Sequence, residues 1–491
     1  MTQSKYLAFD LGAESGRAII GIFDGKKLHI EDIHRFPNKQ IKILGHLHWD
    51  VLGLFEEIKN GLKIAVQKGH ADIRSIGIDT WGVDFGFVGT NNDLLGFPYC
   101  YRDARTNGIP EKVFDKISRE ELYNITGIQF LQFNSVFQLY SAVLANEPAL
   151  KCGGSLLYMP DLFNFLLTGV KKNEYTIAST SQLLNANTKS YDRGIFYSLG
   201  LPMHITVPII APGIAIGKLL PDICDETGLK AVDVVTVGCH DTASAIAAIP
   251  AQKNNWAYIS SGTWSCLGIE TQKPIITNES LINNFTNEGG VFGTIRILKN
   301  VMGLWLIQQT RKSFERLGTT YEYAELVRLA LESKEFVCIL NPDDLSFLNP
   351  PDMLESIRAF CRKTNQTVPQ TPGEFTRSIL ESLALKYKAV LENLCAVTGV
   401  SIDLLHIVGG GSKNELLNQF TADACGIPVV AGPVEATAIG NILVQAIAQK
   451  KIDSIKSGRE IISNSFPIKT YFPEKTAKWN DIFHKYKSLY T

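Results

Sequence analysis

Two short segments of this sequence contain the residue types that bind phosphate groups. The segment 12–17 holds two glycines, a serine and Arg17, and the segment 260–265 holds three serines, a glycine and a threonine. Backbone N–H groups and hydroxyls in such turns can converge on phosphate oxygens, and the Arg17 guanidinium adds a fixed positive charge. One such turn is more often structural, but two in matching positions, with a third glycine turn at 409–411, favour a nucleotide site. No G-x-x-x-x-G-K-[ST] motif is present, which excludes a P-loop.

A second group of polar residues follows an apolar run at 232–237, which ends in Gly-Cys-His-Asp before an alanine-rich stretch. This pattern predicts a strand, a turn and a buried helix, with His240 and Asp241 at the turn. Open α/β sheets bind ligands at such strand ends. Asp241 has the chemistry to accept the proton of an attacking hydroxyl in phosphoryl transfer. A helix N-cap is an equally good interpretation of Asp241 alone.

Two further segments carry groups that suit a polyol or a nucleotide. Asp79, Trp81, Gly82 and Asp84 could line a polyol site, although Trp81 taken alone favours a core position. The segment 298–308 predicts a periodic apolar helix with Asn300 and Gln308 as amides towards its two ends. Amides pair with hydroxyls or with nucleotide edges, but an exposed surface amide is the default interpretation.

The elements that must position these groups alternate between strands and helices. The segment 6–23 predicts a hairpin, apolar residues from Leu54 to Ala65 predict a helix capped by Asp50, and 74–79 predicts a strand with a polar tip. This alternation is typical of an α/β domain.

The same plan restarts about 250 residues later, with a hairpin predicted at 256–270 and a strand at 404–408. A helix ending at Gly426 follows, and a last helix has Trp479, Ile482, Phe483 and Tyr486 on one face. The restart predicts two domains, 1–247 and 248–491, with the boundary near Pro250.

Composition excludes several classes of protein. The 491 residues are 45% hydrophobic and carry a net charge of −1, which argues against disorder and against a basic surface for nucleic acid. Neither a signal peptide nor an apolar run long enough to span a membrane is evident. The nine cysteines form no C-x-x-C pair. We therefore expect a cytoplasmic protein that binds neither nucleic acid nor a membrane.

Short motifs spread in order over nearly the whole chain resemble sugar kinases of the FGGY family. The Thr-Trp-Gly-Val-Asp-Phe stretch at 80–85 and the Leu-Lys-Asn-Val-Met-Gly-Leu-Trp stretch at 298–305 are more specific than the phosphate turns. The motifs that carry the resemblance are 10–17, 77–84, 101–105, 239–243, 261–265, 287–290, 298–305, 408–414 and 433–437.

This resemblance implies an α/β fold of two RNase H-like, actin-like ATPase domains with a cleft between them, in which ATP and a small-molecule ketose meet. Asp241 is implied as the general base, and Mg²⁺ as the companion of ATP, with no metal ligand assigned. The residues implied to contact the ketose are Gly82, His240, Asp241, Thr242 and Asn300. The residues implied to contact ATP are Ala13, Glu14, Ser15, Gly16, Arg17, Thr263, Gln308 and Gly410.

Two residues depart from the common family pattern. Glu14 stands where small hydroxyl residues are usual, so its carboxylate either points away from the phosphates or helps to position hydrated Mg²⁺. His240 stands where many members have glycine. The nearest alternative is an L-fuculose kinase or another ketose kinase of the same family. A remote alternative is an actin-like or chaperone-like ATPase that switches a protein partner. The expected assembly is a monomer or a homodimer.

Overall fold

A computed structural model describes residues 3–490, which form two compact units. The first unit comprises residues up to Pro250 together with 270–297 and 436–465, and the second comprises 251–269, 298–435 and the residues from Phe466 onward. The sequence placed 270–297 and 436–465 in a domain 248–491. In the structure both segments belong to the first unit, so the chain passes between the units several times.

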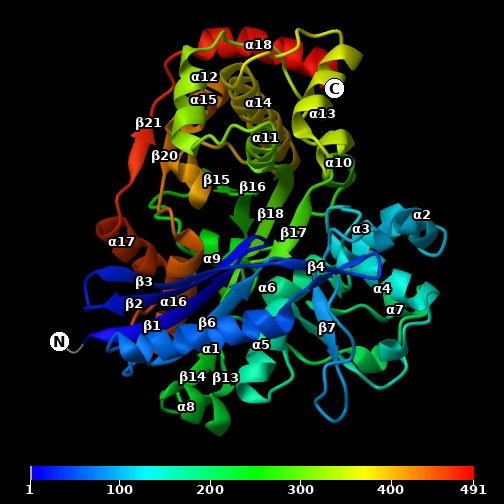
Figure 1. The fold of residues 1–491 in the computed structure, drawn as a ribbon, viewed down its shortest axis with the longest axis vertical. Coiled ribbons are helices and arrows are strands. Elements are labelled where there is room, and N and C mark those ends of the chain that lie inside the picture. The colour runs from blue at the N-terminus through cyan, green and yellow to red at the C-terminus, as the bar shows by residue number, and fades with distance from the viewer. Residues whose placement is uncertain (1–2, 491) are drawn as a thin grey trace. The chain divides into compact units, whose positions relative to one another are not determined.

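The first unit is built on a mixed six-stranded sheet (Figure 1). Strands β1 and β2 form the hairpin expected from the sequence, and β1 also pairs in parallel with β6, so that Asp10 lies beside both Arg17 and Asp79. The strands in spatial order are β13 (Ala215–Lys218), β14 (Asp233–Val235), β6 (Ser75–Thr80), β1 (Ser4–Leu11), β2 (Ser15–Phe23) and β3 (Leu28–Pro37).

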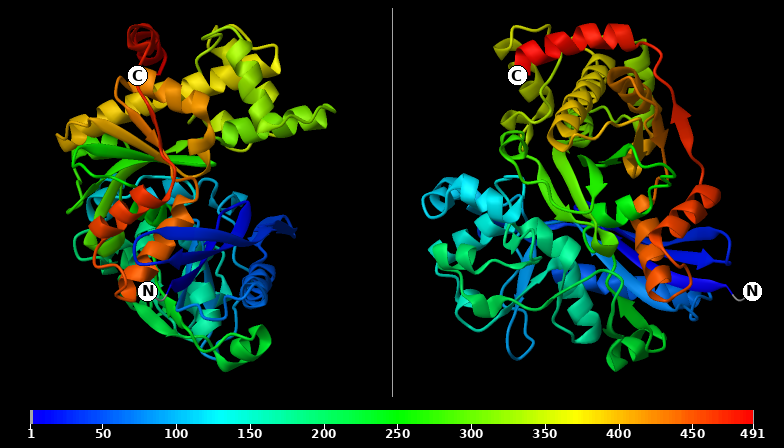
Figure 2. Two further views of the ribbon diagram at one scale, coloured as in Figure 1. Left: turned by 90° about the vertical axis from the view of Figure 1, so that its left-hand side faces the viewer. Right: turned by 180° about the vertical axis from the view of Figure 1, so that it is seen from behind.

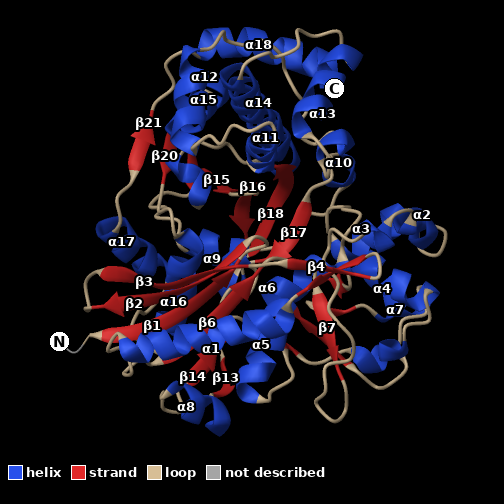
Figure 3. Ribbon diagram, viewed as in Figure 1, coloured by secondary structure: helices blue, strands red, loops and turns tan. Residues whose placement is uncertain are grey.

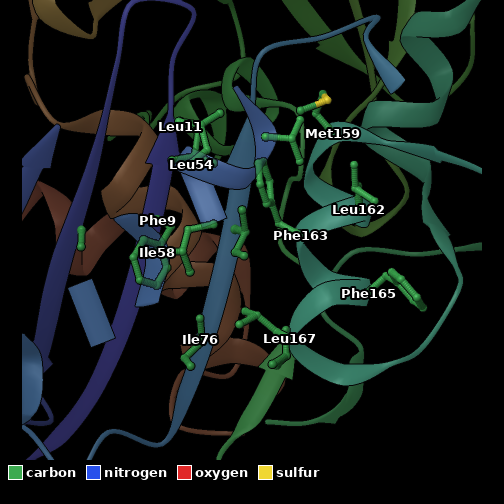
Figure 4. Close-up of a cluster of buried hydrophobic side chains, with 14 of the residues drawn as sticks. Phe9, Leu11, Leu54, Ile58, Ile76, Met159, Leu162, Phe163, Phe165 and Leu167 are labelled. Atoms are coloured by element: carbon green, nitrogen blue, oxygen red, sulfur yellow. The ribbon is translucent and has the colours of Figure 1, made fainter. Parts of the chain in front are cut away.

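Helices cover both faces of this sheet. Helix α1 (Val51–Gln67) begins where the Asp50 carboxylate accepts the Gly53 N–H, as the sequence predicted. It packs with α5 (Met159–Thr168) over one face, where alternate residues of β1 such as Phe9 and Leu11 are buried (Figure 4). Helix α16 (Ala436–Ala448) contacts β1 and β6, and it also contacts α9 (Asp241–Ala247). In Figure 2, α16 and α17 (Ile455–Ser465), coloured orange to red, lie alongside the first strands.

Short strands and helices complete the first unit. The paired strands are β4 (Gln40–Ile43) with β5 (His46–Trp49), β7 (Phe85–Val88) with β8 (Ser155–Tyr158), β9 (Asn173–Glu174) with β12 (Ile209–Ile210), and β10 (Leu184–Asn185) with β11 (Ser190–Tyr191). The remaining α-helices are α2 (Ile109–Phe114), α3 (Arg119–Thr126), α4 (Ser135–Leu144), α6 (Tyr175–Ala178), α7 (Arg193–Ser198), α8 (Pro221–Thr227) and α10 (Asn278–Ile282).

A second, seven-stranded sheet carries the hairpin β15–β16 that the sequence predicted. Helix α14 (Pro372–Thr398) is the longest of the second unit's described helices (Figure 3). Its Tyr387 hydroxyl lies 2.7 Å from Ser265 Oγ on β16. The strands are β17 (Thr286–Gly289), β18 (Ile295–Met302), β16 (Trp264–Thr271), β15 (Trp256–Ser261), β19 (Leu404–Val408), β20 (Val429–Ala431) and β21 (Lys469–Tyr471). The helices are α11 (Trp305–Arg316), α12 (Tyr323–Glu332), α13 (Met353–Lys363), α14 (Pro372–Thr398), α15 (Glu415–Cys425) and α18 (Thr476–Tyr490).

Most of the elements predicted in the second half are confirmed. Strand β19 leads into the glycine turn, α15 ends at Gly426 with φ of 71°, and α18 buries Trp479, Phe483 and Tyr486. The helix predicted over 298–308 is wrong, because 298–302 lies in β18 and α11 starts only at Trp305. A short apolar run fits either periodicity, and here pairing within the sheet decides the outcome.

No helix among residues 3–490 is both long and apolar enough to cross a membrane.

Candidate active site

The turn that carries His240 and Asp241 lies between β14 and α9, as the sequence predicted. The Thr80 N–H at the end of β6 donates to the Cys239 carbonyl at 2.9 Å, which ties this turn to the sheet. Asp241 is the first residue of α9, and the N-cap position is occupied by His240. The alternative interpretation of Asp241 as an N-cap is therefore wrong.

The Asp241 carboxylate is held from several sides and still reaches solvent. Its Oδ1 accepts the Thr242 N–H at 2.5 Å and the Thr242 hydroxyl at 3.0 Å. His240 Nε2 lies 3.4 Å from the same oxygen. The side chain remains 32% exposed, so an alcohol can approach it. A fixed, accessible carboxylate is what a general base for a hydroxyl group requires.

His240 is fixed from its other side by a buried ion pair. Its Nδ1 lies 3.2 Å from Oε2 of Glu288 on β17 and 3.1 Å from Nη2 of Arg296 on β18. Although burial acts to raise the pKa of Glu288, the polar contact with His240 and the charge of Arg296 outweigh it and hold the pKa below its usual value. The imidazole therefore bridges this ion pair and Asp241.

Gly82 lies beside His240, at the end of β6. A Cβ atom at Gly82 would lie 3.3 Å from His240 Nε2 and 3.5 Å from Thr180 Oγ1. This close approach brings together the two residues that the sequence assigned to one site.

Trp81 and Asp84 do not line this site. Both are buried, and the indole N–H of Trp81 donates to the Asp84 carboxylate at 3.0 Å. The core interpretation of Trp81 is confirmed, whereas the expectation that Asp84 lines a polyol site is wrong. Together they brace the turn that presents Gly82.

The first phosphate turn joins β1 to β2. Ala13 is half-buried, while Glu14 and Ser15 are exposed at its tip. A Cβ atom at Gly16 would lie 2.2 Å from the Phe36 ring, so only glycine fits there. Arg17 forms an ion pair with Asp10, with 3.0 Å between Nε and Oδ2.

Two buried carboxylates lie at the base of this hairpin. Asp79 pairs with Asp10 across β6 and β1, and its Oδ2 accepts the amide of Asn441 at 2.6 Å. Burial first, and then the charge of Asp10, hold the pKa of Asp79 well above its usual range, and the charge of Asp241 acts in the same direction. Asp10, Asp79 and Asp241 thus form one electrostatic cluster within the first unit.

The second unit holds the other predicted nucleotide residues. The Gln308 amide donates to Thr263 Oγ1 at 3.4 Å, which joins α11 to the β15–β16 turn. A Cβ atom at Gly411 would lie 2.0 Å from Ser261 Oγ, so the glycine turn packs directly on that hairpin. Gly410 faces open space, and Gly409 has φ of +84°. Thr263, Gln308 and the 409–411 turn are therefore brought together.

Asn300 also belongs to the second unit, on β18, where the Cys266 thiol lies 3.0 Å from its Oδ1. It is partly exposed rather than a helical surface residue, because the predicted helix at this position is a strand.

Comparison with protein families gives a match over most of the chain. The model of the N-terminal domain of the FGGY family of carbohydrate kinases matches residues 5–248, and the model of the C-terminal domain matches residues 257–449.

The chain belongs to the FGGY family of carbohydrate kinases.

Curated relatives in this family align with nearly the whole chain. A rhamnulokinase of Bacteroides thetaiotaomicron is 48% identical, covering 99% of this chain and 99% of its own length. A rhamnulokinase of Oceanobacillus iheyensis is 43% identical over 96% of this chain and 98% of its own, and one of Bacillus subtilis is 40% identical over 96% and 95%. The chain is therefore a sugar kinase, and FGGY kinases use ATP and a sugar as substrates.

Solved structures of other kinases share the fold. A gluconate kinase of Lactobacillus acidophilus has a TM-score of 0.80 at 14% identity, covering 99% of this chain and 97% of its own. A glycerol kinase of Plasmodium falciparum with ADP has a TM-score of 0.77 at 14% identity, covering 100% and 99%. The expected fold of two actin-like domains is confirmed.

The sequence reasoning gave no role to Glu288, Arg296 or Asp10, and it took Asp79 only as a residue that could line a polyol site. Asp10, Asp79 and Glu288 fall inside the family motifs, so a signal was present, but isolated acidic residues in strands indicate no specific contact. Arg296 gave no signal, because its partners lie on other elements of the fold.

Proposed function

We propose that this FGGY kinase transfers the γ-phosphoryl group of ATP to the 1-hydroxyl of L-rhamnulose, giving L-rhamnulose 1-phosphate and ADP. The observation that carries the proposal is the Gly82–His240–Asp241 constellation, which joins a base to a polar site within one unit. The curated rhamnulokinases at 39–48% identity support the choice of ketose. So does the family resemblance of the sequence, whose most specific motifs are 80–85 and 298–305.

In this mechanism Asp241 accepts the proton of the 1-hydroxyl as its oxygen attacks the γ-phosphorus. Thr242 donates two hydrogen bonds to Oδ1, which fix the carboxylate before the ketose binds. Gly82, His240 and Asn300 contact the other ketose oxygens. Positioning and charge stabilisation account for most catalysis in phosphoryl transfer, and a positioned general base adds about 10²–10⁴-fold.

The phosphates of ATP lie against residues 13–17 and Thr263, and the rest of the nucleotide contacts Gln308 and Gly410. Two features fit this assignment. The buried Oε1 of Gln308 has no hydrogen-bond partner among the described residues, and Gly410 has no atom within 4 Å of a Cβ position. The first leaves an acceptor for a nucleotide N–H or hydroxyl, and the second leaves room for a ligand.

Mg²⁺ fits the carboxylates at the base of the first hairpin. The buried Oδ1 of Asp79 has no hydrogen-bond partner among the described residues, and Asp10 lies beside it. Residues 3–490 contain no group of three or more His, Cys, Asp or Glu side chains suited to a metal. Mg²⁺ is commonly held by one or two carboxylates with substrate phosphates, so Asp10 and Asp79 would hold it and it would offset phosphate charge.

We place the enzyme in the cytoplasm, as a monomer or homodimer, without nucleic-acid or membrane partners. Glu14 lies at the exposed tip of the phosphate turn, where its carboxylate can contact hydrated Mg²⁺ or solvent.

The direct test is ADP release with ATP, Mg²⁺ and a panel of L-rhamnulose, L-fuculose, L-ribulose, D-xylulose and glycerol. A rate with L-rhamnulose at least about tenfold above the others is the expected result. A preference for L-fuculose would keep the mechanism and change the substrate. ADP release that no sugar stimulates would instead favour an ATPase that switches a protein partner.

Replacing the base tests the mechanism itself. We expect Asp241→Asn to lower turnover about 10²–10⁴-fold, because the amide cannot accept the hydroxyl proton. ATP binding, measured by calorimetry, should stay within about twofold, since Asp241 contributes no contact to the nucleotide in this assignment. Turnover close to that of the wild type would remove Asp241 from the role of base.

A further inference from the structure

Glu288 and Arg296 form a buried charged pair that the mechanism above does not use. Arg296 is fully buried, and its Nε donates to the Gly289 carbonyl at 2.8 Å. Its Nη2 lies 3.1 Å from Glu288 Oε2 and 3.1 Å from His240 Nδ1. Buried ion pairs often contribute little net stability compared with apolar residues of similar size. Net stability therefore does not account for this pair, whereas the positioning of a neighbouring group does.

The pair also leaves one polar atom of Arg296 unused. The buried Nη1 of Arg296 has no hydrogen-bond partner among the described residues. A buried donor without a partner carries a desolvation cost. The position of the guanidinium therefore favours the contacts of Nη2 with Glu288 and His240 over a hydrogen bond for every N–H group.

The charges around His240 decide where its proton lies. Arginine can only donate, so an Nδ1 that faces Arg296 Nη2 accepts, and the neutral ring then carries its proton on Nε2. In the other tautomer, Nδ1 donates to Glu288 and Nε2 is unprotonated. The Nε2 lone pair then faces the Asp241 carboxylate at 3.4 Å. That arrangement is repulsive unless the ring is doubly protonated, which again places a proton on Nε2.

We propose that Glu288 and Arg296 are positioning residues that hold a proton on Nε2 of His240 and direct this N–H to Asp241 and the ketose. The inference rests on the proposed function, in which His240 contacts the ketose and Asp241 is the base. Backbone contacts keep the pair in place, because the Gly289 N–H donates to Ser179 Oγ at 2.8 Å. A Cβ atom at Gly289 would also lie 2.6 Å from the Tyr175 ring, which fixes the path of β17.

A double-mutant cycle between Glu288 and His240 tests whether Glu288 acts through the imidazole. We expect Glu288→Gln to lower kcat/KM for L-rhamnulose about tenfold, and His240→Asn to lower it about 10–100-fold, the range for one hydrogen bond to a charged group. In the His240→Asn background, Glu288→Gln should change kcat/KM by less than about twofold, because the group it positions is gone. A full tenfold loss in that background would overturn the proposal.

Two further readouts separate positioning from general damage. KM for ATP should stay within about twofold in every variant of the cycle. In ¹⁵N-histidine spectra, the His240 signal, assigned by its loss in His240→Asn, should show a protonated Nε2 in the wild type. A bare Nε2 would overturn the proposal. If Glu288→Gln does not fold, Arg296→Lys replaces it in the cycle, because lysine keeps the charge and loses the planar fork.

The first unit offers a matched control in the ion pair of Glu270 and Arg459. Its Oε2–Nη2 distance is 2.6 Å, and both side chains are 12% exposed. Glu270→Gln should lower the melting temperature much as Glu288→Gln does and leave kcat/KM within about twofold.

Asp241→Asn is measured in parallel. An active Asp241→Asn enzyme removes the proposed base, whereas an inactive one with an additive cycle removes only the positioning role.

Discussion

Asp84 is a buried carboxylate solvated only by neutral donors of the protein. Its Oδ2 accepts the indole N–H groups of Trp49 at 2.6 Å and Trp81 at 3.0 Å and the Tyr101 N–H at 3.1 Å. Its Oδ1 accepts the Gln138 amide at 2.8 Å. These bonds cross-link four segments around the turn that presents Gly82, which explains why a residue in a family motif lies outside the ligand site.

The protonation of Asp84 should make stability depend on pH. Burial raises the pKa of Asp84 to about 6, against the lowering effect of its four hydrogen bonds. An acid with a raised folded pKa stabilises the folded state most below its unfolded pKa near 4, and this contribution is lost as the pH rises through about 6. We compare the free energy of unfolding of the wild type with that of Asp84→Asn. The difference should fall by up to about 3 kcal/mol between about pH 4 and about pH 6 and then stay constant. Urea unfolding at a series of pH values measures it, and a constant difference would contradict the prediction.

Gly82→Ala tests how closely the ketose side of the site is packed. The new Cβ would crowd His240 Nε2 at 3.3 Å, so we expect KM for the ketose to rise about tenfold and KM for ATP to stay within about twofold. Gly89→Ala is the control, because its Cβ would lie 3.3 Å from Leu95 in a loop after β7. Equal effects of the two variants would show that the loss is not local to His240.

At the scale of elements, α16 joins the first sheet through buried amides rather than through apolar contact alone. Its Asn441 donates to Asp79 and to the Gly77 carbonyl, and its Gln445 donates to the Leu7 carbonyl at 3.0 Å. The Ser75 hydroxyl donates to Gln445 Oε1 at 2.8 Å. Since a Cβ atom at Gly77 would lie 2.5 Å from Asn441 Oδ1, β6 needs glycine at this crossing.

Removing one of these amides should cost stability. Asn441→Ala takes away the donor to the buried Asp79 carboxylate, and we expect a loss of about 2–3 kcal/mol in the free energy of unfolding. Gln449→Ala, just beyond the end of α16, removes a partly exposed bond to Asp233 at 3.0 Å and should cost under about 1 kcal/mol. Urea unfolding with an unchanged m-value measures both losses. Equal losses would contradict the prediction that the buried Asn441 amide contributes more than the partly exposed Gln449 amide.

The elements predicted from the sequence were those with strong local signals. The two hairpins, the Asp50 cap of α1 and the Gly426 end of α15 depend on residues close in the chain. The segment 298–302 was predicted as a helix because its short apolar run fits either periodicity, and its place in the sheet depends on pairing with strands outside the segment. Glu288 and Arg296 escaped for the same reason, since their contact with His240 joins residues more than 45 positions apart.

At the scale of the molecule, the two units are not two continuous halves of the chain. Residues 436–465 supply α16 and α17 to the first unit, and 270–297 supply β17 with Glu288. Repeated hairpins in the sequence indicated two similar domains, which the fold comparison confirms. They carried no signal for which later segments return to the first unit, because that depends on packing against β1, β6 and α9.

This exchange of segments predicts how a divided chain behaves. A cut at Pro250 falls between α9 and β15 and breaks no helix or strand. A fragment 1–250 nevertheless lacks α16, so the Asp79 carboxylate loses its Asn441 donor and the face of β1 and β6 beneath α16 becomes exposed. We expect this fragment to unfold without a cooperative transition and to bind a hydrophobic dye. Co-production with a fragment 251–491 should restore cooperative unfolding and ketose-dependent ADP release, because the missing helix is then supplied by the second chain. Calorimetry of each preparation measures whether unfolding is cooperative. If the fragment 1–250 alone unfolded cooperatively near the melting temperature of the intact chain, α16 would be a peripheral addition to the first unit and not part of its core.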